Sequence, residues 1–301
     1  MKYLIPAKTF LFGEYSALAG GSVLGLGTKS GFEVNFLKQA NADFPFHLES
    51  PAGVLWSEEI ANQNGKNNWH INFVDLLGGV GGFGRSTAEY LSVLILQLEK
   101  NQDEFSNIRK KYQILSSKGG AGASGADLAI QYFGNVTYFN SIENSYSSKN
   151  WNYKGYDFIL VSTGFKIKTH EHILQLDLNK IKNFPLISNE IIKQCLNGDG
   201  KELVLGLKEW ANFLLKNSLT HDKSVELKTS LESDADILCA KPCGALGADV
   251  ILIVCEQVKT KNILEKLKKK NLTVQATAKD LCPGIYQQLS WSNLNISGDL
   301  K

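Results

Sequence analysis

The chain has 301 residues, of which 43% are hydrophobic and 21% are charged, so it can bury a sizeable core and is not intrinsically disordered. Its 32 Lys and Arg residues nearly balance its 30 Asp and Glu residues, which leaves no strong basic field for nucleic acid or an anionic membrane. Since the apolar runs are too short to span a bilayer and the start lacks the apolar stretch of a secretory signal, we expect a cytoplasmic protein without a nucleic-acid or membrane partner.

The first half alternates short apolar runs with turn residues, which is typical of strands. Strands are expected over residues 2–5, 22–26, 31–37, 46–48 and 69–77, with polar loops over 41–44 and 62–68. After a glycine-rich loop, residues 86–100 have helical periodicity, with Ser86 or Thr87 as the cap and Glu89 in the first turn. This half is completed by a helix over 105–116, a helix starting near Ala126, a strand over 135–140 and a polar surface connection over 141–153.

The second half is richer in helices. It begins with a strand over 156–162, and helices are expected over residues 171–178, 188–196, 201–216 and 223–231. They are followed by a buried strand over 249–255, a basic amphipathic helix over 259–270 and a strand over 272–278. Because strands come first, then helices, and a strand–helix–strand unit comes last, the order favours an α+β fold over a doubly wound parallel sheet.

The cysteines indicate reduced thiols rather than disulfides. All five lie in the second half, their number is odd and no CxxC pair occurs, a pattern that fits a reducing compartment. Cys239 and Cys243 would share one face of a helix, but Pro242 between them argues against a helix there.

Glycine is clustered rather than spread along the chain. The 27 glycines are concentrated at residues 13–31, 78–84, 119–125 and 244–247, and such clusters suggest loops built around a ligand. The 78–84 loop lies between a strand and a helix, where backbone N–H groups and the helix dipole favour a phosphate. Residues 79–84 also satisfy G-x-G-x-x-G, but Glu99 lies at the end of the following helix, so a nicotinamide dinucleotide is disfavoured.

Four short segments carry recognisable motifs. Residues 6–15, PAKTFLFGEY, resemble P-x-K-x-x-L-x-G-E-[HY], and residues 82–88, GFGRSTA, resemble G-L-G-S-S-A-A. Residues 124–127, SGAD, resemble S-G-x-D, and residues 241–249, KPCGALGAD, resemble K-x-[ST]-G-A-G-G-G-[GD]. In this order they resemble the motifs of the galactokinase, homoserine kinase, mevalonate kinase and phosphomevalonate kinase (GHMP) superfamily.

This resemblance implies a two-part α+β fold. The N-terminal part, residues 1–155, would be β-rich and similar to domain 2 of ribosomal protein S5, and the C-terminal part, residues 156–301, would be ferredoxin-like. The active site would lie between them and bind ATP, Mg²⁺ and a small-molecule acceptor. The chain would be a monomer or a homodimer.

The resemblance also assigns roles to residues. Asp127 would be the catalytic acid–base group and Lys8 the cation beside it, although alone they would be interpreted as a helix-start carboxylate and a surface lysine. Expected nucleotide contacts are Gly79, Gly81, Gly82, Gly84, Arg85, Ser86 and Thr87, with Ser86 also a magnesium ligand. Expected acceptor contacts are Glu14, Tyr15, Ser124, Gly125, Thr169, His170, Gly244 and Ala245.

The expected reaction is transfer of the γ-phosphoryl group of ATP to an isoprenoid-pathway acceptor. Tyr15 and Asp249 are more similar to phosphomevalonate kinases, which makes 5-phosphomevalonate the first choice and mevalonate the alternative. Ser116 stands where mevalonate kinase has a glutamate ligand for magnesium. A third alternative is a degenerate, non-catalytic binding protein. It is suggested by Arg85 in place of a serine, where the guanidinium would grip a phosphate or fill the pocket, and by Leu246 and Ala248 in place of glycines.

Overall fold

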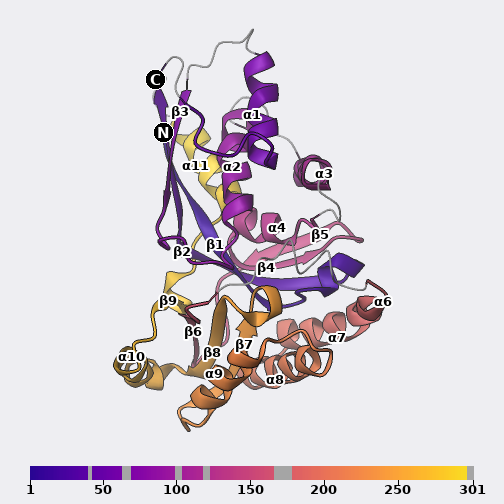
Figure 1. The fold of residues 1–301 in the computed structure, drawn as a ribbon, viewed down its shortest axis with the longest axis vertical. Coiled ribbons are helices and arrows are strands. Elements are labelled where there is room, and N and C mark those ends of the chain that lie inside the picture. The colour runs from indigo at the N-terminus through magenta and orange to yellow at the C-terminus, as the bar shows by residue number, and fades with distance from the viewer. Residues whose placement is uncertain (40–42, 63–68, 99–103, 118–122, 166–177, 297–301) are drawn as a thin grey trace.

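The computed structural model describes residues 1–39, 43–62, 69–98, 104–117, 123–165 and 178–296. Figure 1 shows a five-stranded sheet with helices beside it in the upper part of the view and a four-stranded sheet with its own helices in the lower part. The expected α+β class is confirmed. Within the described residues, no helix is both long and apolar enough to cross a membrane.

The first sheet is antiparallel and is built around one long strand. It contains β1 (Lys2–Phe12), β2 (Ser22–Lys38), β3 (Trp69–Asp75), β4 (Asn135–Asn140) and β5 (Ser145–Lys149). The first half of β2 pairs with β4 and its second half pairs with β3. Two strands were expected over 22–26 and 31–37, but β2 is continuous. Gly31 lets β1 approach it closely, since a Cβ there would lie 2.2 Å from the carbonyl oxygen of Ile5.

Two expectations for this part are wrong. Residues 46–48 form no strand and instead precede α1 (Pro51–Asn62), which the sequence analysis missed. The helix begins at Pro51, where a missing N–H costs nothing, and the hydroxyl of Ser50 accepts the N–H of Gly53. The 141–153 connection contains β5, a polar edge strand that pairs with β4.

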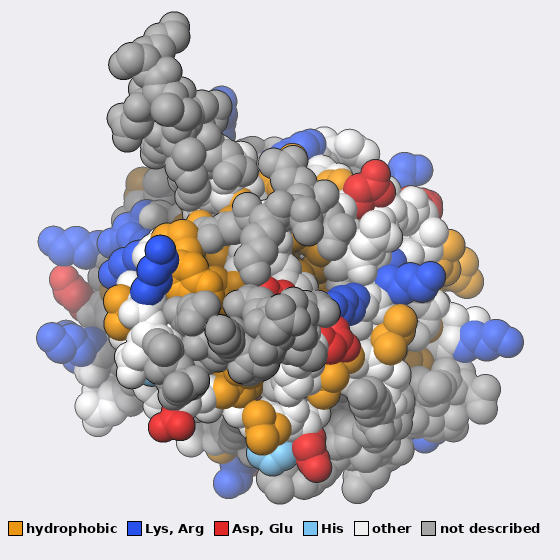
Figure 2. Space-filling view, turned by 90° about the horizontal axis from the view of Figure 1, so that it is seen from above, with side chains coloured by type: hydrophobic (Ala, Val, Ile, Leu, Met, Phe, Trp, Pro, Cys, Tyr) orange, Lys and Arg blue, Asp and Glu red, His pale blue; other side chains and the backbone are white. Residues whose placement is uncertain are grey.

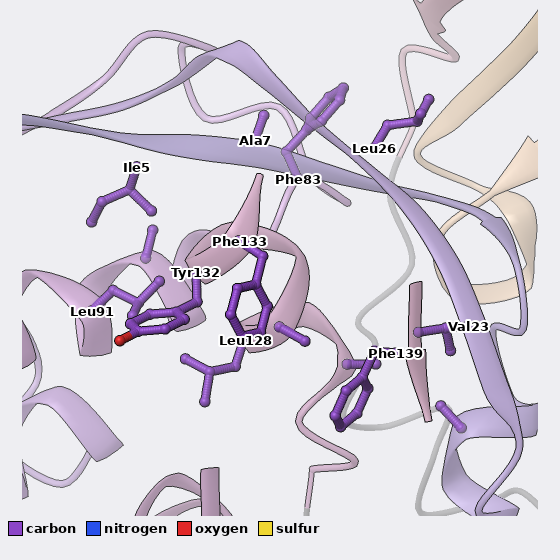
Figure 3. Close-up of a cluster of buried hydrophobic side chains, with 14 of the residues drawn as sticks. Ile5, Ala7, Val23, Leu26, Phe83, Leu91, Leu128, Tyr132, Phe133 and Phe139 are labelled. Atoms are coloured by element: carbon purple, nitrogen blue, oxygen red, sulfur yellow. The ribbon is translucent and has the colours of Figure 1, made fainter. Parts of the chain in front are cut away.

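The helices α2 (Arg85–Leu98), α3 (Phe105–Ser116) and α4 (Ala126–Phe133) complete this part. Figure 3 shows Leu91 of α2 and Leu128 and Tyr132 of α4 among the buried side chains beside β1, near Ile5. Helix α2 is buried on most of its circumference. This packing fixes the position of its N-terminus, which directly follows the glycine loop.

The second sheet has the order β7-β8-β6-β9 and all of its neighbouring strands are antiparallel. Its strands are β6 (Tyr156–Ser162), β7 (Ile237–Cys243), β8 (Val250–Glu256) and β9 (Val274–Thr277). The helices are α6 (Leu178–Ile181), α7 (Phe184–Asn197), α8 (Gly200–Lys216), α9 (Asp222–Glu232) and α10 (Thr260–Lys269). Short 3₁₀ turns are η1 (Ser16–Ala19), η3 (Ala245–Gly247), η4 (Gln257–Lys259) and η5 (Ala278–Asp280).

One face of this sheet packs against α9 and α10, and the other joins the main core, to which α8 contributes Leu207 and Trp210. The helix expected over 171–178 lies almost wholly outside the described residues. All five cysteines are buried and unpaired, as the sequence predicts.

The final helix, α11 (Ile285–Ile296), returns to the N-terminal part and packs on α4 and β1. The side-chain amide of Gln288 accepts the N–H of Leu4 at 3.0 Å and donates to the carbonyl oxygen of Leu4 at 2.7 Å. It therefore pairs with β1 as a neighbouring strand would. The division of the chain at residue 155 stays a prediction.

Candidate active site

A cavity of about 980 Å³ lies where the two parts meet. From the N-terminal part it is lined by β1, the turn after β1, the 78–84 loop and the starts or ends of α2, α3 and α4. From the C-terminal part it is lined by Gly244, Ala245 and Asp249. In Figure 2, Lys and Arg side chains are spread around the face shown with Asp and Glu between them, which agrees with the near-zero net charge.

The structure brings Lys8 and Asp127 together at the wall of this cavity. The ammonium of Lys8 lies 3.0 Å from a carboxylate oxygen of Asp127, and the two side chains are 9% and 35% exposed. Asp127 is in the first turn of α4, which is capped by Gly125 at a φ of +83°. A Cβ at Gly125 would lie 2.8 Å from the side chain of Arg109, so glycine is needed for the turn that aims this carboxylate into the cavity.

The 78–84 loop lies directly on Lys8. The backbone N–H of Lys8 donates to the carbonyl oxygen of Phe83 at 3.0 Å. Gly84 has a φ of +84°, and a Cβ there would come within 2.8 Å of the Lys8 side chain. The loop and α2 contribute Gly79, Gly81, Gly82, Gly84, Arg85, Ser86 and Thr87 to the cavity wall, so every expected nucleotide contact faces this cavity.

Ser86 does not cap α2 as expected, and Arg85 is engaged by two carboxylates. Helix α2 begins at Arg85, so Ser86 lies in the first turn and is not the cap. The guanidinium of Arg85 donates to Glu89 at 3.0 Å and to Asp75 at 3.2 Å. Neither carboxylate lines the cavity, although Arg85 itself does. The guanidinium is thus bound to two carboxylates, and its contact with a phosphate stays a prediction.

The third glycine loop contains Leu246, whose φ is +49°. Its N–H donates to the hydroxyl of Tyr15 at 2.9 Å, and its carbonyl oxygen accepts the N–H of His221 at 2.8 Å. Neither Leu246 nor the fully buried Ala248 lines the cavity. Leu246 and Ala248, which stand where the motif has glycines, therefore do not narrow the cavity. The two hydrogen bonds hold Leu246 in the left-handed conformation.

Glu14 and Tyr15 line the cavity beside this loop. Both oxygens of the Glu14 carboxylate are engaged, one by the ammonium of Lys241 and the other by the indole N–H of Trp210 at 2.9 Å. All three residues are buried. Burial raises the pKa of Tyr15 well above its usual value, so its phenol stays protonated.

Ser124 and Gly125 also line the cavity, whereas Thr169 and His170 lie outside the described residues. Sequence reasoning missed several residues of the site, among them Tyr112 on the cavity wall and Trp210, which holds Glu14. Tyr112 had a usable signal, because it lies one helical turn before Ser116 on a predicted helix that leads into a glycine loop. Trp210 had none.

No protein-family model matches the chain, and no curated protein matches its sequence. Its fold, however, is similar to solved structures. The mevalonate kinase of Methanococcus jannaschii has 16% identity over 91% of this chain and 96% of that one, with a TM-score of 0.66. The phosphomevalonate kinase of Streptococcus pneumoniae, in complex with phosphomevalonate and AMPPNP, has 16% identity over 92% and 99%, with a TM-score of 0.71.

The galactokinase of Lactococcus lactis complexed with galactose has 12% identity over 92% of each chain and a TM-score of 0.65. A homoserine kinase from Cytophaga hutchinsonii also matches, with 12% identity over 91% of this chain and 93% of that one and a TM-score of 0.55. The chain therefore has the fold of the GHMP kinases, as its four motifs predict.

Proposed function

We propose that the protein is an ATP-dependent small-molecule kinase. The observation that carries this proposal is the Lys8–Asp127 ion pair of 3.0 Å, which stands on the wall of a cavity under a glycine-rich loop. The similarity to solved structures of mevalonate kinase, phosphomevalonate kinase and galactokinase supports it.

Each part of this arrangement has a task in phosphoryl transfer, which depends on positioning and on charge stabilisation. The loop and the first turn of α2 would hold the phosphates, because the first N–H groups of a helix have no partner within it. Asp127 would orient the acceptor hydroxyl and take its proton. The ammonium of Lys8 would stabilise negative charge on Asp127 and on the transferring group.

The donor groups of the cavity fit Mg²⁺, which takes oxygen ligands and usually keeps phosphate oxygens and water as well. The hydroxyl of Ser86 and the carboxylate of Asp127 both line the cavity and would hold it. When bound, the ion would neutralise phosphate charge. Ser116 is less suited, since its hydroxyl donates to the carbonyl oxygen of Gln113 and accepts the N–H of Ala123.

For the acceptor we propose 5-phosphomevalonate, with mevalonate as the alternative. Tyr15 and Asp249 favour the former by resemblance, and the solved phosphomevalonate kinase with its substrate has a similar fold. The features that suggest a non-catalytic binding protein lose weight, because the charge of Arg85 is offset by two carboxylates and Leu246 and Ala248 do not line the cavity.

The test is a coupled ADP-release assay with ATP and Mg²⁺ over four acceptors: 5-phosphomevalonate, mevalonate, homoserine and galactose. We expect the highest kcat/KM with 5-phosphomevalonate. Turnover with mevalonate alone would establish the alternative acceptor. Binding of ATP without turnover of any acceptor would contradict the kinase proposal and support a binding protein.

A further inference from the structure

Two hydroxyl groups meet at the wall of the cavity, between the start of α2 and the end of α3. The hydroxyl oxygens of Thr87 and Tyr112 are 3.2 Å apart. The residues are 2% and 6% exposed, and both line the cavity. They belong to two different helices, α2 and α3, so the contact is made by the tertiary fold.

The proton count of this pair leaves one donor unused. Each hydroxyl carries one proton, and whichever oxygen donates in the mutual bond, the other keeps its own proton. Within the described residues, no further hydrogen bond is made by Thr87 or Tyr112. Buried polar groups are nearly always satisfied, so an uncommitted O–H at a cavity wall is available to water or to a ligand atom that accepts a hydrogen bond.

The position of the pair at the start of α2 favours anionic ligand atoms. Thr87 is in the first turn of α2, where the helix dipole favours an anion. Burial raises the pKa of Tyr112 to about 12, and the charge of Asp127 adds to this rise, while the bond to Thr87 acts against it. The phenol is therefore neutral, and when Thr87 donates the mutual bond, Tyr112 keeps the free proton of the pair at the cavity wall.

We propose that Tyr112, together with Thr87, forms a second wall of the phosphate cradle and donates a hydrogen bond to a phosphate oxygen of bound ATP. This inference rests on the proposed function. A neutral hydroxyl suits this place because it adds a donor without adding a negative charge that would repel the triphosphate. Asp127 is paired with Lys8 through one carboxylate oxygen.

Tyr90 provides a matched control. Its ring lies 4.9 Å from that of Tyr112, and it is fully buried. Its hydroxyl donates to the carbonyl oxygen of Ile108 at 3.4 Å, and it does not line the cavity. Removing this hydroxyl changes the same aromatic pair without touching the cradle.

The experiment measures binding of AMPPNP and of adenosine by isothermal titration calorimetry to wild type, Tyr112→Phe and Tyr90→Phe. We expect Tyr112→Phe to weaken AMPPNP binding by about 10-fold or more, the size of a lost hydrogen bond to a charged group. Adenosine binding should not change. Tyr90→Phe should bind both ligands as wild type does.

A second pair of variants covers the other hydroxyl. Thr87→Val removes it at nearly constant volume and should weaken AMPPNP binding, whereas Thr87→Ser keeps it and should bind as wild type does. The inference is overturned if Tyr112→Phe keeps wild-type affinity, if Tyr90→Phe loses as much affinity, or if adenosine is weakened equally. A wild-type protein that does not bind AMPPNP would overturn the proposed function as well, which separates the two failures.

Discussion

At the scale of single residues, the side chains of Lys8 and Asp127 differ in exposure, and this difference matters for the chemistry. Asp127 keeps about a third of its side chain accessible from the cavity, while Lys8 is almost completely shielded by the strand and the glycine loop. Shielding from water strengthens the attraction between the two charges. The carboxylate is therefore placed to meet a ligand, and the ammonium supports it from behind.

Replacing Asp127 by asparagine keeps its shape and removes its ability to take a proton. We predict that Asp127→Asn lowers kcat by about 100-fold or more, measured as ADP release with the best acceptor. Asp222→Asn is the control, because Asp222 is also in the first turn of a helix but lies outside the cavity. A wild-type rate for Asp127→Asn would remove this residue from the mechanism.

Arg85 makes ion pairs with two carboxylates near the start of α2. Its guanidinium neutralises Asp75 and Glu89, whose side chains are only 11% and 18% exposed. Without it, two carboxylates beside the start of α2 would repel a bound triphosphate. We therefore predict that Arg85 serves ATP binding by cancelling charge.

We predict that Arg85→Ser weakens ATP binding by about 3-fold to 10-fold, the range expected of partly screened charges. The triple variant Arg85→Ser, Asp75→Asn, Glu89→Gln should regain wild-type affinity, since the repelling charges are gone. Calorimetric titration with AMPPNP measures both. If the guanidinium gripped a phosphate instead, the triple variant would stay as weak as the single one.

At the scale of elements, the regular helices and the loop-to-helix connections follow from local signals. Periodicity and glycine placement predict α2, α3, α8 and the start of α4. The missed strand β7 contains Lys241 and Pro242, which look unlike a buried strand. Pro242 is tolerated because β7 is at the edge of its sheet, the place where a strand accommodates a proline without losing a ladder hydrogen bond.

The turn between α9 and β7 makes one element-scale prediction possible. Hydrogen bonds from Lys266 and Lys259 lower the pKa of Asp236 from 3.8 to about 2. Since the folded pKa is below the unfolded one, this group stabilises the fold fully above about pH 4, and its contribution is lost as the pH falls through about 2. The contact ties α10 to the turn, so acid should loosen this side of the C-terminal sheet first.

We predict that Asp236→Asn makes the free energy of unfolding fall less steeply than in wild type between pH 4 and pH 2. Urea unfolding followed by circular dichroism at a series of pH values measures this. Glu58→Gln is the comparison. Glu58 of α1 pairs with Lys111 of α3, both side chains are exposed, and the pair is distant in sequence from Asp236. Equal slopes for Asp236→Asn and wild type would contradict the prediction.

At the scale of the whole molecule, Glu14 joins the two parts. Its carboxylate comes from the turn after β1, while Lys241 and Trp210 come from β7 and α8 of the other part. No local pattern could reveal this, because the partners are 227 and 196 residues away in sequence. The G-E-Y motif located the residue correctly at the cavity, but its bonds became visible only in the folded chain.

Residues next to this contact line the cavity on both sides of the junction. Tyr15 follows Glu14 directly, and Gly244 and Ala245 lie a few residues beyond Lys241 on the same chain segment. All of these except Lys241 line the cavity. Burial alone would lower the pKa of Lys241, but Cys243 and Glu14 outweigh it and raise the pKa above its usual value, so the ion pair stays charged.

A buried ion pair is costly to break from one side, because the remaining charge loses its partner. We predict that Lys241→Met lowers the free energy of unfolding by about 3–5 kcal/mol. The double variant Glu14→Gln, Lys241→Met should regain most of this, since no buried charge remains and the glutamine oxygen can still accept the indole N–H of Trp210. Chemical denaturation measures both variants. A double variant as unstable as the single one would show that the loss arises from packing rather than from the unpaired carboxylate that joins the two parts.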